Sequence, residues 1–167
     1  RSCRARRASP GTCRSSETGM ELIDAAGKMH RPVPGKVRIV SLVPSITELI
    51  CDLGLAPLLV GRTGFCIHPE NDVRAIRKVG GTKSVDLEAI RALQPTHVIL
   101  NIDENEKPTA DLLAQFVPNL VVTHPLAPLD NLALFRLIGG IFGRTDQAEM
   151  LSERFKTGYD SGAHEKK

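Results

Sequence analysis

The chain has 167 residues, of which 41% are hydrophobic and 25% charged, a balance typical of one globular domain. A net charge of +3 and an aromatic content of 4% without tryptophan argue against a protein that binds nucleic acid by charge or base stacking. No segment approaches the roughly 18 apolar residues of a membrane-spanning helix, and no apolar segment of a secretory signal follows the basic amino terminus.

Residues 1–19 carry five arginines, one glutamate and almost no large apolar side chain. Burial cannot offset the entropy cost of ordering such a segment, so we expect a disordered basic arm, with Met20 as an alternative start. We expect residues 20–35 to be irregular. The cysteines form no CxxC pair and are expected to be reduced thiols: Cys3, Cys13, Cys51 and Cys66.

The first predicted strand and helix lie in "KVRIVSLVPSITELICDLG", residues 36–54. The β-branched run before Pro44 is typical of a strand buried on both faces. Ser45 and Glu48 have the spacing of a helix capping box, and Gly54 is a natural residue to end that helix. The segment "PLLVGRT", residues 57–63, predicts a second strand.

The segment 64–85 is rich in loop residues, with one predicted helical turn over 70–76. The Gly80-Gly81 pair predicts unusual backbone dihedrals or a close approach of backbone. Asp86 is expected to cap a helix over 87–93, and "HVILN", residues 97–101, is the next predicted buried strand.

An acidic loop and a helix are predicted over 102–116, with Leu112, Leu113 and Phe116 facing inward, and "LVVTH" (120–124) follows as a strand. From Asp130 a single long helix is expected to run to about Phe155. Its apolar residues cover much of its circumference, so it should pack against more than one element. Three glycines interrupt it and either weaken it by about 1 kcal/mol each or permit tight packing: Gly139, Gly140 and Gly143.

The alternation of strands and helices predicts an α/β fold, a Rossmann-like parallel sheet flanked by helices and followed by a long helix. The predicted lobe covers 36–129, the long helix 130–155 and a polar tail 156–167. Ligands of open parallel sheets bind beyond the carboxyl ends of the strands. Three segments are expected there: the helix start at Ser45, "NIDEN" at 101–105 and "THPLAP" at 123–128.

The order of these motifs resembles the amino-terminal lobe of a cobalamin-type (class III) substrate-binding protein. The resemblance rests on "RIVSLVPSITELICDLGLAPLLVGRTGFCIHPENDVRAIRKVGG" followed by "VDLEAIRALQPTHVIL", and covers about residues 36–155. That family comprises the iron-siderophore and vitamin B12 receptors of ABC importers. Its members have two Rossmann-like lobes joined by one long helix, with the ligand between them.

The resemblance implies a set of ligand-binding residues in the loops that face the cleft: Pro44, Ser45, Phe65, Cys66, Gly81, Thr82, Asn101 and Asp103. It also implies that Glu88 docks onto basic residues of the importer's membrane subunits, and that the helix from Asp130 connects the lobes. This chain stops at Lys167 without a second α/β lobe. We therefore expect a fragment, a truncated product or a half-size relative.

Several of these residues have a second interpretation. Ser45 and Glu48 either only cap a helix or also direct its amino end at an anionic ligand group. Cys66 and His68 are either loop residues without a metal or supply an axial ligand to corrinoid cobalt or heme iron, whereas His97 and His124 lie elsewhere. The acidic run 103–106 is a solvated loop, a chelating site or an acid–base pair. Glu88 also complements the helix dipole.

The sequence predicts a binding protein rather than an enzyme, because it has no P-loop, no nucleophile elbow and no GxGxxG motif. The expected ligand is cobalamin or a ferric siderophore, with no resident cofactor or metal. The expected partners are the membrane subunits of an ABC importer, without nucleic acid or membrane insertion. The resemblance implies an extracytoplasmic location. The alternatives are an unexported corrinoid- or partner-binding domain in the cytoplasm, and a small hydrolase or transferase on a Rossmann-like scaffold.

Overall fold

The computed structural model describes residues 21–164, which form a five-stranded parallel sheet with helices on both faces. Its strands lie in the order β5-β4-β3-β6-β7, and every neighbouring pair is parallel. If these five strands are numbered 1 to 5 from β3 to β7, their order across the sheet is 3-2-1-4-5. This is the strand order of a Rossmann-like half, the fold that the sequence predicts. The strands are β3 (Ile39–Ser41), β4 (Leu59–Arg62), β5 (Arg77–Lys78), β6 (His97–Asn101) and β7 (Asn119–Thr123).

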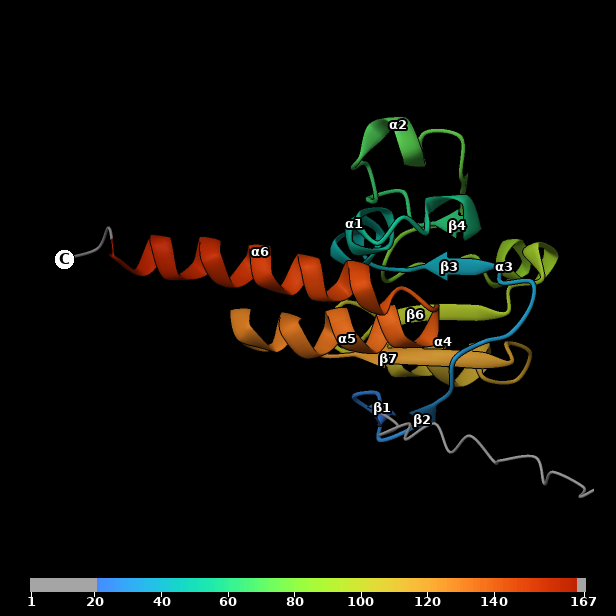
Figure 1. The fold of residues 1–167 in the computed structure, drawn as a ribbon. Coiled ribbons are helices and arrows are strands. Elements are labelled where there is room, and N and C mark those ends of the chain that lie inside the picture. Colours follow the sequence, from blue (N-terminus) through green and yellow to red (C-terminus); the bar gives the residue numbers. More distant parts are fainter. Residues whose placement is uncertain (1–20, 165–167) are drawn as a thin grey trace, which may run out of the picture.

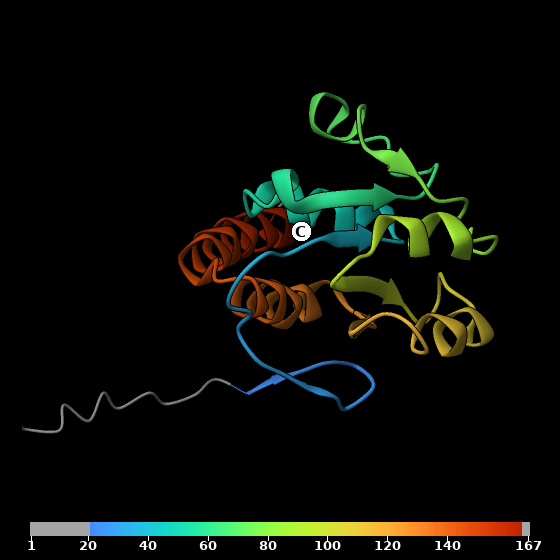
Figure 2. The same cartoon turned by 90° about the vertical axis from the view of Figure 1, so that its right-hand side faces the viewer.

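Figure 2 shows α5 and α6 on one side of the sheet and α3 and α4 on the other. The described helices are α1 (Pro44–Asp52), α2 (Glu70–Val73), α3 (Leu87–Leu93), α4 (Lys107–Leu113), α5 (Asn131–Ile141) and α6 (Thr145–His164), with 3-10 turns η1 (Ala56–Leu58) and η2 (Pro128–Asp130). None of the helices within 21–164 is long and apolar enough to cross a membrane.

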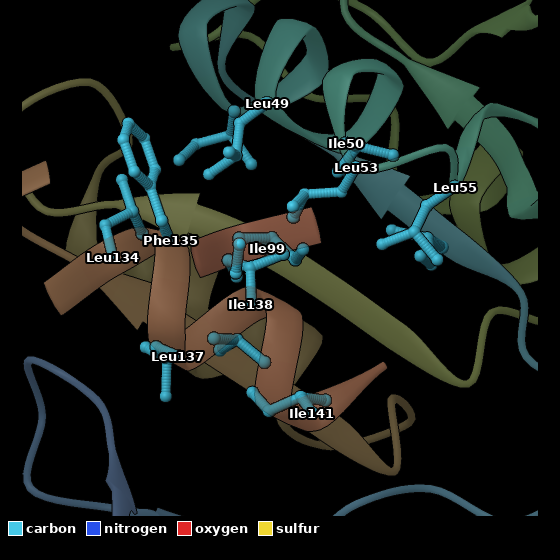
Figure 3. Close-up of a cluster of buried hydrophobic side chains, with 14 of the residues drawn as sticks. Leu49, Ile50, Leu53, Leu55, Ile99, Leu134, Phe135, Leu137, Ile138 and Ile141 are labelled. Carbon is cyan, nitrogen blue, oxygen red and sulfur yellow. The ribbon is translucent and has the colours of Figure 1, made fainter. Parts of the chain in front are cut away.

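Alternate residues of the central strands pack into two separate hydrophobic cores, one on each face of the sheet. Ile39 and Ile99 point to the face covered by α1 and α5, where they pack in one cluster with Ile138 of α5 (Figure 3). Val40 and Val98 point to the opposite face, against α3 and α4. Successive side chains of a strand point to opposite faces, so a strand covered on both sides reads as a continuous apolar run.

The segment predicted as one long helix is two helices. α5 ends at Ile141 and α6 begins at Thr145, with Gly143 between them at φ +65°. The helices pack closely, because a side chain at Gly139 would collide with Ala148 and with the Arg144 carbonyl. Gly139 therefore permits tight packing, as one of the two interpretations held. α6 continues to His164, through most of the predicted polar tail, and extends past the amino-terminal end of α5 (Figure 1).

The segment predicted as irregular contains a small antiparallel hairpin, β1 (Leu22–Ile23) and β2 (Met29–His30). The hairpin covers the outer edge of β7. The amide of Ala25 donates to the Val122 carbonyl over 2.9 Å, and the Val122 amide donates to the Asp24 carboxylate over 3.1 Å. A covered edge cannot pair with another chain, so the hairpin protects one side of the sheet.

Two predictions about helices are wrong in detail. α1 begins at Pro44, and its N-cap residue, Val43, offers no side-chain cap, so Ser45 and Glu48 form no capping box. Leu112 is half exposed, unlike the fully buried Leu113 beside it. The predicted cap of α3 is confirmed, since Asp86 accepts a hydrogen bond from the Ala89 amide over 2.9 Å. The expected basic arm, 1–19, lies outside the described residues.

Candidate ligand-binding site

The carboxyl ends of the five strands meet along one edge of the sheet, which we call the rim. The chain reverses its direction across the sheet between β3 and β6, and ligands of doubly wound folds bind at such a switch point. The Leu42 amide donates to the Ile99 carbonyl over 3.0 Å and keeps the two strand ends together. Pro44 follows β3 and Asn101 ends β6, so these two predicted ligand-binding residues lie on either side of the switch point.

The loops after β4 and β5 are joined through their glycines. The Gly64 amide donates to the Gly80 carbonyl over 2.7 Å, and the Phe65 ring lies against Gly81. Gly80 has φ +95°, and a side chain there would collide with the carbonyl of Ser84. The prediction that this glycine pair needs unusual dihedrals or a close approach of backbone is therefore confirmed at Gly80. The exposed Phe65 ring is held at the rim by this backbone.

The loops after β5 and β6 are joined through Asn105. Its side-chain amide donates to the Thr82 carbonyl over 2.8 Å, and its side-chain oxygen accepts from the Asn101 amide over 3.0 Å. The Asn101 side-chain oxygen in turn accepts from the Asp103 amide over 2.8 Å. Asn101 is therefore buried and shapes the loop, whereas Asp103 is exposed on it. Sequence reasoning gave Asn105 no role.

The amino end of α1 also lies at this rim, directly after β3. Its N-cap residue supplies no side-chain acceptor, and Ser45 is exposed in the first turn. The first backbone amides of a helix carry partial positive charge and bind carboxylate or phosphate groups when no side chain caps them. The interpretation of Ser45 as a helix cap is therefore wrong. That the helix end is directed at an anionic ligand group stays a prediction.

Cys66 differs from the other predicted ligand-binding residues, because its side chain is only 1% exposed and its sulphur lies 3.1 Å from the Thr63 hydroxyl. Contrary to expectation, the thiol points into the lobe and cannot reach a ligand or its metal. His68 is exposed, but it borders a hollow of about 340 Å³ beside α2, with Arg62 and Arg74. Within residues 21–164, no three His, Cys, Asp or Glu side chains converge as metal ligands.

The rim carries large apolar side chains that solvent reaches freely. They follow β4, β6 or β7, and the sequence analysis singles out only the first of them: Phe65, Ile102, Leu126 and Leu129. Phe65 is 64% exposed and Leu126 is 75% exposed. Apolar side chains gathered on one surface of a folded protein indicate a surface that another molecule or domain covers.

Asp103 and His124 link the loops after β6 and β7. The Asp103 carboxylate oxygen Oδ2 lies 3.1 Å from Nδ1 of His124. Thr123, the last residue of β7, donates its hydroxyl to the Leu100 carbonyl over 2.9 Å and fixes the backbone that carries His124. The loops after β4, β5, β6 and β7 are thus connected in series along the rim.

A family model described as "Periplasmic binding protein" matches residues 39–161, so the chain belongs to that family. This confirms the resemblance to class III substrate-binding proteins and the α/β fold. The members of this family bind solutes and are not enzymes, in agreement with the prediction from the sequence. No curated protein matches the chain.

Three solved structures illustrate the similarity. The periplasmic heme-binding protein RhuT from Roseiflexus sp. RS-1 is 29% identical at a TM-score of 0.63, covering 71% of this chain and 46% of its own. The vitamin B12-binding protein BtuF of Vibrio cholerae is 18% identical at 0.68, covering 74% and 48%. SirA of Staphylococcus aureus, complexed with staphyloferrin B, is 22% identical at 0.62, covering 81% and 46%. The chain thus spans about half the length of each.

Proposed function

We propose that this chain forms one wall of the ligand cleft in the substrate-binding component of an ABC importer for metal chelates of the cobalamin, heme or siderophore class. The observation that carries the proposal is the rim itself: loops from neighbouring strands, tied together by hydrogen bonds, present exposed apolar side chains at the switch point of the sheet. The ligands named for RhuT, BtuF and SirA support this substrate class.

In the proposed mechanism, the chelate is held between this rim and a second wall. Phe65 and Leu126 supply apolar contact area, Thr82 and Asp103 supply polar contacts, and the amino end of α1 at Pro44 and Ser45 receives an anionic group of the ligand. Gly81 allows the ligand to approach the backbone. One wall alone offers few contacts against the entropy cost of association, so we expect weak binding by this chain by itself.

Glu88 is the proposed contact to the membrane subunits of the importer. It lies in the first turn of α3 with its side chain 84% exposed, and the Arg91 guanidinium is 3.7 Å away. A pair this exposed is worth little and leaves the carboxylate free to exchange partners. Docking of this kind places the complete protein outside the cytoplasm, which is part of the proposal.

The proposal is tested by titrating the chain with hemin, cobinamide, cyanocobalamin and a ferric hydroxamate siderophore, followed by absorbance and calorimetry. We expect saturable binding of at least one chelate, weakened in Phe65→Ser. Tyr159→Ser is the matched control, because Tyr159 is an exposed aromatic on α6, outside the rim loops. Unchanged absorbance and heat for all four chelates at high micromolar concentration contradict the proposal.

A further inference from the structure

His124 is held with one edge of its ring buried and the other exposed. Its side chain is 28% exposed as a whole, yet Nδ1 is buried. The Asp103 carboxylate oxygen Oδ2 lies 3.1 Å from Nδ1, although Nδ1 makes no hydrogen bond of good geometry. The exposed part of the ring therefore lies away from Nδ1, and the side chain borders a hollow of about 230 Å³ between the hairpin, the end of β7 and α5.

The position of the carboxylate selects the protonation pattern of the ring. A carboxylate beside Nδ1 favours the tautomer with the proton on Nδ1, which leaves the lone pair on Nε2. Histidines that bind metals are held in this way, because a second group fixes the tautomer and the ring orientation and raises the basicity of the other nitrogen. At the end of β7, His124 is thus a Lewis base on the rim.

Other imidazoles and thiols of the described side chains, 21–161, are less suited to reach a ligand there. His30 is buried and bonded to Asp24 over 2.9 Å. His97 is 1% exposed and bonded to Thr96. Cys66 is buried, and His68 borders the separate hollow beside α2. His124 alone combines an exposed ring edge, a carboxylate neighbour and a place on the rim.

We propose that Nε2 of His124 is an axial ligand to the iron or cobalt of a planar tetrapyrrole, with Asp103 positioning the ring. This inference rests on the proposed function and narrows the ligand class to tetrapyrroles. Heme and corrinoids have an open axial position for a side chain, whereas a hexadentate ferric siderophore has none. Exposed Ile102 and Leu126 follow β6 and β7 next to the pair and offer apolar contact to a macrocycle. Phe65 follows β4, three strand spacings or about 14 Å away.

The test uses the full chain with ferric hemin and with cobinamide, read by absorbance and electron paramagnetic resonance. We expect a Soret band and a ferric signal of histidine-ligated heme, lost in His124→Gly and restored there by free imidazole. His68→Gly is the matched control and keeps both signals. Asp103→Asn keeps the ligation with affinity lowered about tenfold or more, because the ring loses its orienting carboxylate.

The outcomes separate this inference from the proposed function. Hemin and cobinamide binding with unchanged spectra in His124→Gly overturns the axial role and leaves the receptor function intact. The same holds if the ferric siderophore binds and neither tetrapyrrole does. A purely structural Asp103–His124 pair would destabilise the fold in His124→Gly without any rescue of ligation by imidazole. Absence of binding by every chelate overturns both proposals.

Discussion

Ile99 and Ile102 lie three residues apart, yet one is in the interior of the lobe and the other on its rim. Ile99 is fully buried between α1 and α5, whereas Ile102, just past the end of β6, is 48% exposed. Phe135 and Phe65 differ in the same way. In the interior, buried apolar side chains stabilise the fold, whereas on the rim the same residue types are exposed to solvent. Stability and ligand binding should therefore respond to different substitutions.

The largest effect is expected in the interior, from Ile138→Ala. Ile138 is completely buried at the centre of the core between α1, α5 and the sheet (Figure 3). Removing it leaves a cavity and should lower the free energy of unfolding by about 2–5 kcal/mol. Urea denaturation measures this, with Ile102→Ala as the rim control, expected within about 0.5 kcal/mol. Equal losses for the two variants would mean that the interior and the rim do not differ as described.

Acid should weaken the interior before it affects the rim. Burial lowers the pKa of His97 from 6.5 to about 4, and the nearby positive charges of His30 and Lys28 add to this. In the unfolded chain His97 takes up a proton near pH 6.5, whereas in the folded chain it does so only near pH 4. The free energy of unfolding therefore decreases as the pH is lowered from about 6.5 to about 4. The loss reaches up to about 2 kcal/mol at pH 5.

Urea denaturation at pH 7 and pH 5 measures this loss, and His97→Asn should remove most of the difference. Asp24 does not contribute in this window. Burial by itself raises the pKa of its carboxyl group, but hydrogen bonds from His30 and from backbone amides outweigh burial and lower it, so its contribution is lost only at more acidic pH. An unchanged pH difference in His97→Asn would assign the acid sensitivity to another group.

The rim counterpart of these variants is Phe65→Ala. Because the ring is 64% exposed, its removal should change the unfolding free energy by no more than about 0.5 kcal/mol. If a chelate binds over the rim, its affinity should fall about tenfold, or 1.4 kcal/mol, through lost aromatic contact. Calorimetric titration and urea denaturation of one preparation measure both. A stability loss as large as that of Ile138→Ala would show that Phe65 belongs to the interior.

The smallest effects distinguish the two predicted helix caps. Asp86→Ala should cost about 1 kcal/mol, because the carboxylate caps α3, whereas Ser45→Ala should cost less than about 0.5 kcal/mol, because Ser45 caps nothing. Thermal unfolding of the two variants side by side measures the difference. A cost at Ser45 equal to that at Asp86 would restore the capping box and remove one argument for an uncapped helix end at the rim.

The sequence was sufficient for four of the five strands and for the cap of α3, whereas the two-residue edge strand β5 lies in a segment predicted as loop. Strands covered on both faces form continuous apolar runs, so β3, β6 and β7 were readable, and Asp86 stands directly before an apolar helical stripe. The capping box failed because Pro44 is itself a favoured first residue of a helix and moves the helix start one position earlier. The spacing of Ser45 and Glu48 could not reveal this.

Features that depend on distant partners were not predictable. The hairpin β1–β2 has two residues in each strand, too few for any periodic pattern, and it is held by bonds to Val122 far along the chain. Asn105 acts through Thr82, and only the short spacing from Asn101 hinted at a turn. The break between α5 and α6 was signalled by Gly143, but the apolar pattern runs across it.

The central claim is that the rim, and no other surface of the lobe, contacts the chelate. Amide chemical shifts of the ¹⁵N-labelled chain during titration with diamagnetic cobinamide test it most directly. The account predicts shifts clustered in the loops after the strands, including Ser45, Phe65, Thr82 and Asp103. Shifts clustered instead around the hollow of about 500 Å³ beside Met150 and Arg154 of α6, with the rim unchanged, would contradict it.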